Sequence, residues 1–298
     1  MNPPAISARA ERVERLVTLV TVLTPLAAFI LAVILLWQRA VTLPDLVVCF
    51  AMYLLTVLGI TLGYHRLFTH QSFKCVAGLR WVLGIAGSMA GQGPLCFWVA
   101  SHRRHHQHSD AAGDPHSPHT HGGDGWAVVR GWWHSHLGWM LKHKPENYYR
   151  LCHDLVRDPV TLAVHRRYVV WVLAGLLLPG LITGLTAGNW RAVATGILWG
   201  GLVRLFLVHH VTWSVNSVCH LFGSAPHDTG DESRNNALIA VLSLGEGWHN
   251  NHHAFPASAR HGLHWWQVDP SYLCLCGLRA CGLVWALRVP AGGHGNPP

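Results

Sequence analysis

The sequence predicts an all-α integral membrane protein with four transmembrane helices and a cytoplasmic helical cap. Half of the 298 residues are hydrophobic and only 12% are charged, whereas soluble domains carry about 25% charged residues. Four apolar runs are long enough to cross a bilayer. The chain contains 24 histidines but only 14 acidic residues, which favours nitrogen-ligated metal chemistry. Because no repeat or low-complexity tract divides the chain, we expect one membrane domain over residues 1–298.

The four apolar runs define the predicted spans. Residues 13–37 form the first span, and a short link that contains Pro44 leads to the second, over residues 46–63. So short a link predicts a helical hairpin. The third and fourth spans are expected over residues 168–187 and 192–213, again joined by a short link.

The basic residues orient these spans. Residues 63–167 contain 12 of the 22 Lys and Arg residues, and the cytoplasmic loops of membrane proteins are enriched in both types. Four crossings return the two termini to one side. We therefore expect both termini, and the cytoplasmic or interfacial regions 64–167 and 214–298, on the cytoplasmic side.

The apolar stretch 76–100 is interrupted by several glycines and by Pro94. If it crossed the bilayer, histidine clusters on its two sides would lie on opposite faces of the membrane. We therefore expect an interfacial or re-entrant segment, with a fifth crossing as the alternative. The segment that follows, 125–140, contains four tryptophans and is predicted to lie at the interface.

The formal net charge of +8 does not indicate a nucleic-acid partner, because the basic residues are scattered beside apolar segments rather than gathered in tracts. A lipid bilayer with anionic head groups is the expected partner. The eight cysteines form no CxxC pair, and we expect them to be reduced packing residues.

Three histidine motifs lie at the predicted cytoplasmic ends of the apolar runs. They are HRLFTH at 65–70, HRRHH at 102–106 and HNNHH at 249–253. The HxxHH spacing places three imidazoles on one face of a helix. Eight imidazoles exceed what one structural or catalytic zinc uses, so the cap is predicted to hold a histidine-rich di-metal site. Imidazole ligation by itself does not choose among Fe, Zn, Cu and Ni.

These motifs resemble those of the membrane fatty-acid desaturase family, in particular its acyl-CoA Δ9 desaturases and their bacterial relatives. GDPHSP at 113–118, NSVCH at 216–220 and GEGWHNNHH at 245–253 extend the likeness, in the family's order, over residues 40–270. The resemblance implies two iron ions. One would be bound by His65, His70, His102, His106 and His252, and the other by His105, His220, His249 and His253. Asn216 would reach the second iron through a water, and no catalytic residue beyond the metal ligands is expected.

The reaction implied by the resemblance is the dioxygen-dependent desaturation of a saturated fatty-acyl chain, with a cis double bond at the Δ9 position. No side-chain base can break the C–H bonds of a saturated acyl chain, so a cofactor must supply the chemistry. The acyl chain would arrive on coenzyme A, a carrier protein or a lipid. Electrons would come from a separate donor, a ferredoxin, rubredoxin or cytochrome b5, with its reductase. A histidine-box hydroxylase or acetylenase is the alternative. A metal transporter is disfavoured, because the spans contain none of the clusters.

Several further residues have two interpretations. Tyr53 lies 12 residues before His65, about 18 Å along a helix, and either closes the substrate tunnel or is a lipid-facing or packing residue. Asp110 and Asp114 either orient ligating imidazoles or belong to a turn. Arg103 and Arg104 either bind the phosphates of coenzyme A or are positive-inside residues without a ligand, and the sequence does not separate the two. The loop histidines, which we expect to be ordinary solvated side chains, are His108, His116, His119 and His121.

Overall fold

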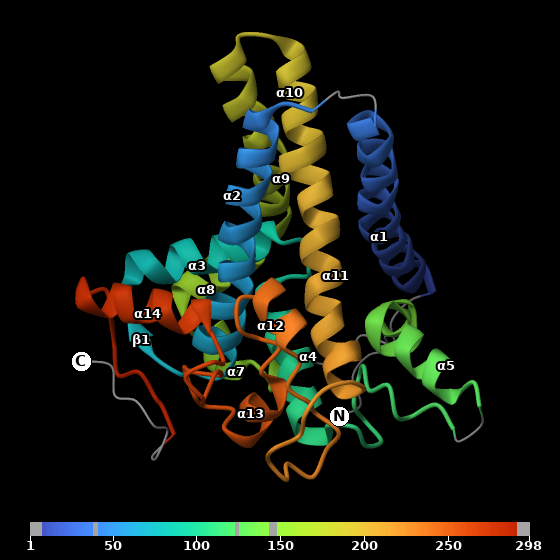
Figure 1. Ribbon diagram of the computed structural model, residues 1–298, viewed down its shortest axis with the longest axis vertical. Helices are drawn as coiled ribbons and strands as arrows, with labels where there is room; N and C mark the ends of the chain where they lie inside the picture. Colours follow the sequence, from blue (N-terminus) through green and yellow to red (C-terminus); the bar gives the residue numbers. More distant parts are fainter. Residues whose placement is uncertain (1–7, 38–40, 123–124, 143–147, 291–298) are drawn as a thin grey trace.

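The computed structural model describes residues 8–37, 41–122, 125–142 and 148–290. Four helical segments in this part of the chain are long and apolar enough to cross a membrane, which confirms the predicted all-α membrane fold. They are Arg12–Leu36, Leu43–Thr69, Tyr168–Ala187 and Trp190–His220. Figure 1 shows them standing together above the shorter helices of the cap.

Each span is built from one or more helical elements. The first is α1 (Ala8–Trp37) and the third is α9 (Tyr168–Ala187). The second joins α2 (Leu43–Leu58) to the π-helix η1 (Gly59–Thr69). The fourth runs through α10 (Trp190–Gly196), the π-helix η4 (Ile197–Val203), α11 (Arg204–Ser217) and the 3-10 turn η5 (Val218–His220).

The second and fourth spans are longer than the sequence predicted. They contain 27 and 31 residues, whereas about 20 residues cross a hydrocarbon core. Hydropathy ends a predicted span at the first polar residues, but here the helix continues past them. Each long helix therefore extends beyond the apolar layer and carries a histidine at its end, His65 in η1 and His220 in η5.

The cap consists of short helices and one small sheet. Its helices are α3 (Ala77–Met89), α4 (Leu95–His108), α5 (Ala127–Trp133), η2 (His134–Gly138), α6 (Trp139–Lys142), η3 (Tyr148–Arg150), α7 (His153–Val156), α8 (Pro159–Arg166), α12 (Ala237–Leu242), α13 (His249–Ala254) and α14 (Pro270–Ala280). Strands β1 (Lys74–Cys75) and β2 (Val284–Trp285) pair antiparallel, with Lys74 opposite Trp285.

The apolar stretch 76–100 forms two helices instead of one crossing. α3 has 13 residues, about 20 Å of helix and too short for a core of about 30 Å. Gly91 and Gly93 both have positive φ, which glycine adopts without the penalty of a side chain. Pro94 then caps the N-terminus of α4. In Figure 1, α3 runs across the direction of α2 and α11, and its position at the interface stays a prediction.

α3 packs against the second span at very short range. A Cβ atom at Gly87 would lie 2.5 Å from the Tyr64 ring and 2.8 Å from the Gly59 carbonyl oxygen. The Tyr64 hydroxyl also forms a hydrogen bond with Ser88, at 2.8 Å. This contact fixes α3 against the helix that carries His65, so it sets the position of one side of the metal-binding region.

The fourth span is tied to its neighbours by a buried cation. The Arg204 guanidinium donates to the carbonyl oxygens of Gly175 in α9 and Met89 in α3, both at 2.8 Å. Met89 is the last residue of α3, so Arg204 also satisfies a carbonyl that the helix end leaves unpaired. One side chain thereby joins two spans to the interfacial helix.

Replacing Gly87 with Ala should lower the stability of the protein by roughly 1–3 kcal/mol, because the added methyl group overpacks a closed interface. Gly78→Ala in the same helix is the matched control, since a methyl group added there would have nothing within 4 Å. Alanine is also the better helix former. Thermal unfolding of the two detergent-purified variants measures their stability. Equal melting temperatures for Gly87→Ala and Gly78→Ala would contradict this account of the packing.

Candidate metal centre

Nine buried or half-buried histidines gather in two adjacent groups in the cap. The five-histidine group contains His65, His70, His102, His106 and His252. The four-histidine group contains His105, His220, His249 and His253. Within each group the ring nitrogens that face one another all lie within 4.8 Å. This division is the same as the one that the family resemblance implies.

The two HxxHH motifs each contribute to both groups. In α4, His102 and His106 join the five-histidine group and His105 joins the four-histidine group. In α13 the pattern is reversed, because His249 and His253 join the four-histidine group. At about 100° per residue, positions i and i+4 lie about 40° apart around the helix axis. Position i+3 lies about 60° from i in the opposite direction. The sequence predicted that each motif would present its three imidazoles to one site. Each helix instead lies between the two groups and contributes imidazoles to both.

The spacing of the nitrogens suits a common cation in each group. Between His65 and His252, and between His70 and His102, the Nε2 atoms lie 3.1 Å apart. The Nε2 atom of His249 lies 3.1 Å from that of His253. Two imidazoles bound at right angles to one metal, with metal–nitrogen bonds of about 2.1 Å, place their nitrogens about 3.0 Å apart. Both groups therefore have the geometry of metal-binding sites.

The protonation pattern supports this fit. His105 Nδ1 lies 2.9 Å from the Asp114 carboxylate and donates its proton there, which leaves Nε2 as the ring nitrogen that faces the centre of the group. That Nε2 atom is buried without a hydrogen-bond partner. A buried lone pair without a donor is costly, and a metal ion at the centre of the group would satisfy it.

Burial, followed by the neighbouring imidazoles, holds the pKa of His102, His249 and His252 well below the ordinary histidine value. These rings are therefore neutral at pH 7. A neutral imidazole is the form that binds a metal, so the electrostatics of the cluster and its geometry agree.

A buried ion network holds the end of the second span against the C-terminal part of the cap. Arg66 donates to Asp269 at 3.0 and 3.1 Å, to Glu246 at 3.3 Å and to the Ala259 carbonyl at 2.7 Å. Glu246 in turn lies 2.5 Å from His65 Nδ1. The position of His65 is thus fixed by residues about 180 positions away in the chain.

Four carboxylates accept from the Nδ1 atoms of site histidines. Two of them are Asp110 and Asp114. They orient imidazoles of the site, which was one of the two roles that the sequence suggested for them. Asp110 lies 2.8 Å from His220 Nδ1. Sequence reasoning missed Glu246, which lies inside the GEGW motif, and Asp231, which lies 2.6 Å from His253 Nδ1. Asp231 gave no sequence signal, because only the fold brings its loop to α13.

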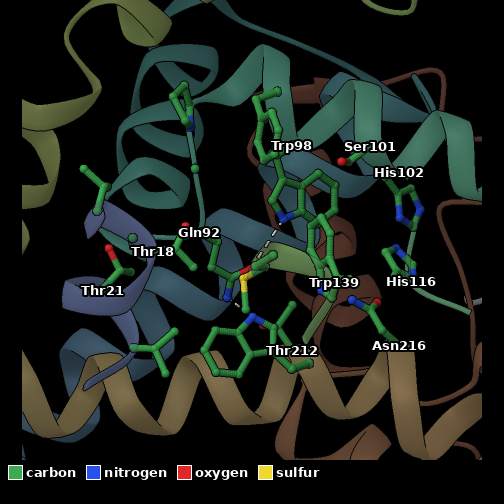
Figure 2. Close-up of a pocket in the computed structure, with 18 of the residues that line it drawn as sticks. Thr18, Thr21, Gln92, Trp98, Ser101, His102, His116, Trp139, Thr212 and Asn216 are labelled. Atoms are coloured by element: carbon green, nitrogen blue, oxygen red, sulfur yellow. Dashed lines mark hydrogen bonds between the residues drawn. The ribbon is translucent and has the colours of Figure 1, made fainter. Parts of the chain in front are cut away.

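A cavity of about 410 Å³ extends from His102 of the five-histidine group to α1. Figure 2 shows His102 and Asn216 at one end and Thr18 and Thr21 of α1 at the other. Trp98 lines the middle of the cavity. The volume is within the range of roughly 300–1,000 Å³ that small-molecule sites occupy.

Hydrogen bonds fix the side chains that line the middle of this cavity. Gln92 donates to the Thr212 hydroxyl at 2.9 Å and accepts from the Trp98 indole at 3.4 Å, as the dashed lines in Figure 2 show. Because the three side chains come from the α3–α4 link, α11 and α4, their contacts define the shape of the cavity beside the histidines.

Two expectations for the surrounding residues need correction. His116 is not a solvated loop side chain, since it is only 4% exposed and lines the cavity beside Trp139. Trp139 itself is buried, whereas the other tryptophans predicted at the interface are more exposed. The turn after α4 folds back over the histidines, because Asp110 and Asp114 bind them, and it carries His116 inward.

Arg103 is already engaged within the protein. It donates to the carbonyl oxygens of Phe68, Thr69 and Leu151 and to Asp154. This favours a structural role over phosphate binding. Tyr53 does not belong to the cavity wall described above, and its hydroxyl donates to the Leu242 carbonyl at 2.6 Å. Its control of chain length stays a prediction.

Comparison with known proteins agrees with the geometry of this site. Residues 42–272 match the family model described as fatty acid desaturase. The chain belongs to the fatty acid desaturase family. As a member of this family, with four helices able to span a membrane, it is an oxidoreductase and an integral membrane protein.

Three similar proteins show the range within the desaturase family. A hex-5-enoyl-[acyl-carrier protein] acetylenase of Moorena producens (strain JHB) is 42% identical over 89% of this chain and 84% of its own length. An sn-1 stearoyl-lipid 9-desaturase of Anabaena variabilis is 42% identical over 78% and 79%. An acyl-CoA C20 Delta5-desaturase of Anemone leveillei is 39% identical over 83% and 75%.

Each histidine group of this desaturase-family protein should hold one metal ion. We expect His252→Ala and His249→Ala each to remove about one of two bound ions per chain, because each takes a ligand from a different group. His264→Ala is the control, since that side chain is exposed and belongs to neither group. Metal content by plasma mass spectrometry tests this, and one ion per chain in the wild type, or loss of both ions from either single variant, would contradict two separate sites.

Proposed function

We propose that the protein introduces a cis double bond into a saturated fatty-acyl chain in a dioxygen-dependent reaction. The observation that carries this proposal is the cavity whose wall includes His102 of the five-histidine group and His116, whose ring lies 4.5 Å from that of His105 in the other group. A largely apolar cavity that begins at a proposed redox metal centre suits a methylene chain. Family membership supports the same reaction class.

The metal ions in this proposal are two irons. His65, His70, His102, His106 and His252 would hold one, and His105, His220, His249 and His253 the other. When bound, the iron pair would supply the oxidising power from dioxygen that removal of two hydrogens from an acyl chain requires. The metal-ligand role of each histidine, and a water-mediated role of Asn216 in the cavity wall, belong to the proposal.

The protein itself would bind, shape and shield the acyl chain. Trp98, held by Gln92 and Thr212, would fix the bend of the chain and so choose which carbon pair faces the histidines. Burial of the site excludes water, which protects a reactive oxidant from side reactions. We propose the Δ9 position and coenzyme A as carrier, with an acyl-carrier protein or a lipid as alternatives, since the relatives named above use all three.

A second candidate function is acetylenase activity. The relative from Moorena producens, an acetylenase, is 42% identical over most of both chains. Such an enzyme would convert an existing double bond to a triple bond at the same kind of centre. The two functions differ in the product, so one experiment separates them.

The test is the fatty-acid profile of a desaturase-deficient bacterial host that expresses the protein, with bond positions located by mass spectrometry. We expect a new cis-monoene that disappears in the His105→Ala, His253→Ala double variant. A triple bond formed only when a monoene is supplied would favour the acetylenase. A hydroxylated chain, or no new product with iron bound and a competent electron donor present, would contradict the desaturase proposal.

We also propose that the cap and both termini face the cytoplasm, where a ferredoxin, rubredoxin or cytochrome b5 with its reductase would deliver electrons. The 12 basic residues within 63–167 support this orientation. A reporter enzyme active only outside the cytoplasm should therefore be active when inserted at Asn189, in the link between the third and fourth spans. The same reporter fused after Pro298 should be inactive, and the opposite pattern would reverse the orientation.

A further inference from the structure

The two histidine groups differ in the carboxylates that surround them. In the four-histidine group, His105, His220 and His253 each donate from Nδ1 to an aspartate. The partners are Asp114, Asp110 and Asp231, at 2.9, 2.8 and 2.6 Å. Three of the four rings in this group are therefore bound to an anion on the side away from the centre.

Among the residues that the structure describes, the five-histidine group has a single partner of this kind. Glu246 lies 2.5 Å from His65 Nδ1, but it also binds Arg66 at 3.3 Å and lies 3.4 Å from His261 Nδ1. Arg66 is at the same time bound to Asp269. The local charge consists of two carboxylates and one guanidinium, so much of the anionic field at this group is compensated.

The three aspartates of the four-histidine group have uncharged partners instead. Asp231 accepts from the hydroxyl groups of Thr229 and Ser233, and Asp114 accepts from the backbone amides of Asp110 and His116. Asp110 accepts from the Ser117 hydroxyl and from the backbone amide of Glu232. These anions are therefore not neutralised by a nearby cation in the contacts just described.

A carboxylate that accepts from Nδ1 makes the imidazole a stronger electron donor at Nε2, and removing such a partner typically costs 10–100-fold in metal affinity. Negative charge near a metal also favours its higher oxidation state. The four-histidine group has three such carboxylates and the five-histidine group one. The extra histidine of the larger group is a neutral ligand and does not replace that charge.

We infer that the two metal positions are electronically unequal, and that Asp110, Asp114 and Asp231 are positioning residues that give the four-histidine position the lower reduction potential. The inference rests on the proposed di-iron function and extends it, because it assigns different redox properties to the two irons. On stepwise reduction of the oxidised protein, the five-histidine position accepts an electron first.

The experiment is a dithionite titration of the full-length, ⁵⁷Fe-loaded protein in detergent, followed by Mössbauer spectroscopy. We expect two separate one-electron steps in the wild type. Asp231→Asn should raise the potential of the later step only, and should weaken retention of that iron against a chelator about 10–100-fold. His70→Ala, which lacks a ligand of the other group, identifies which spectral component belongs to which position.

Glu232→Gln is the matched control, because its side chain binds Arg234 at 2.9 Å and contacts neither group. It should shift neither potential. Asp114→Asn serves as a second variant should Asp231→Asn fail to fold. The inference would be overturned if both irons were reduced at one potential. It would also be overturned if the aspartate variants shifted both steps equally or shifted neither step. The proposed function would stand in each of these cases. A protein that binds no iron would contradict both.

Discussion

Nine buried or half-buried imidazoles must converge in two groups, and much of the structure can be understood from this constraint. Lone pairs that face each other at about 3 Å repel unless a cation lies between them, so each ring has to be fixed from outside the cluster. Carboxylates that accept from Nδ1 do this for His65, His105, His220 and His253. The carboxylates come from loops, and this explains why the cap folds back over the ends of the long spans.

The same constraint links the cap to the membrane part of the chain. His65 and His220 lie at the ends of the second and fourth spans, while α4 and α13 lie entirely in the cap. Arg66 joins these parts, since it lies in η1 and binds Glu246 and Asp269 close to α13 and α14. A helix that enters the cap directly from the bilayer gives the histidines a rigid support, which a loop could not provide as well.

The location of the cavity follows from this arrangement. It lies between α1, α4 and α11, so its wall combines residues of two spans with residues of the cap. A site at this boundary can take an apolar chain from the bilayer side while polar groups remain near the surface of the cap. The shape of the cavity depends on contacts such as that between Gln92 and Thr212, which join segments about 120 residues apart.

The sequence by itself determined the number of spans, the all-α class and the histidine motifs, because hydropathy and i, i+3, i+4 spacing are local properties. It did not determine that the second and fourth spans continue past the apolar layer, that each HxxHH motif is shared between two groups, or that His116 turns into the cavity. Nor did it identify Asp231 as the partner of His253. These features depend on contacts between residues far apart in the chain, which only the tertiary structure decides.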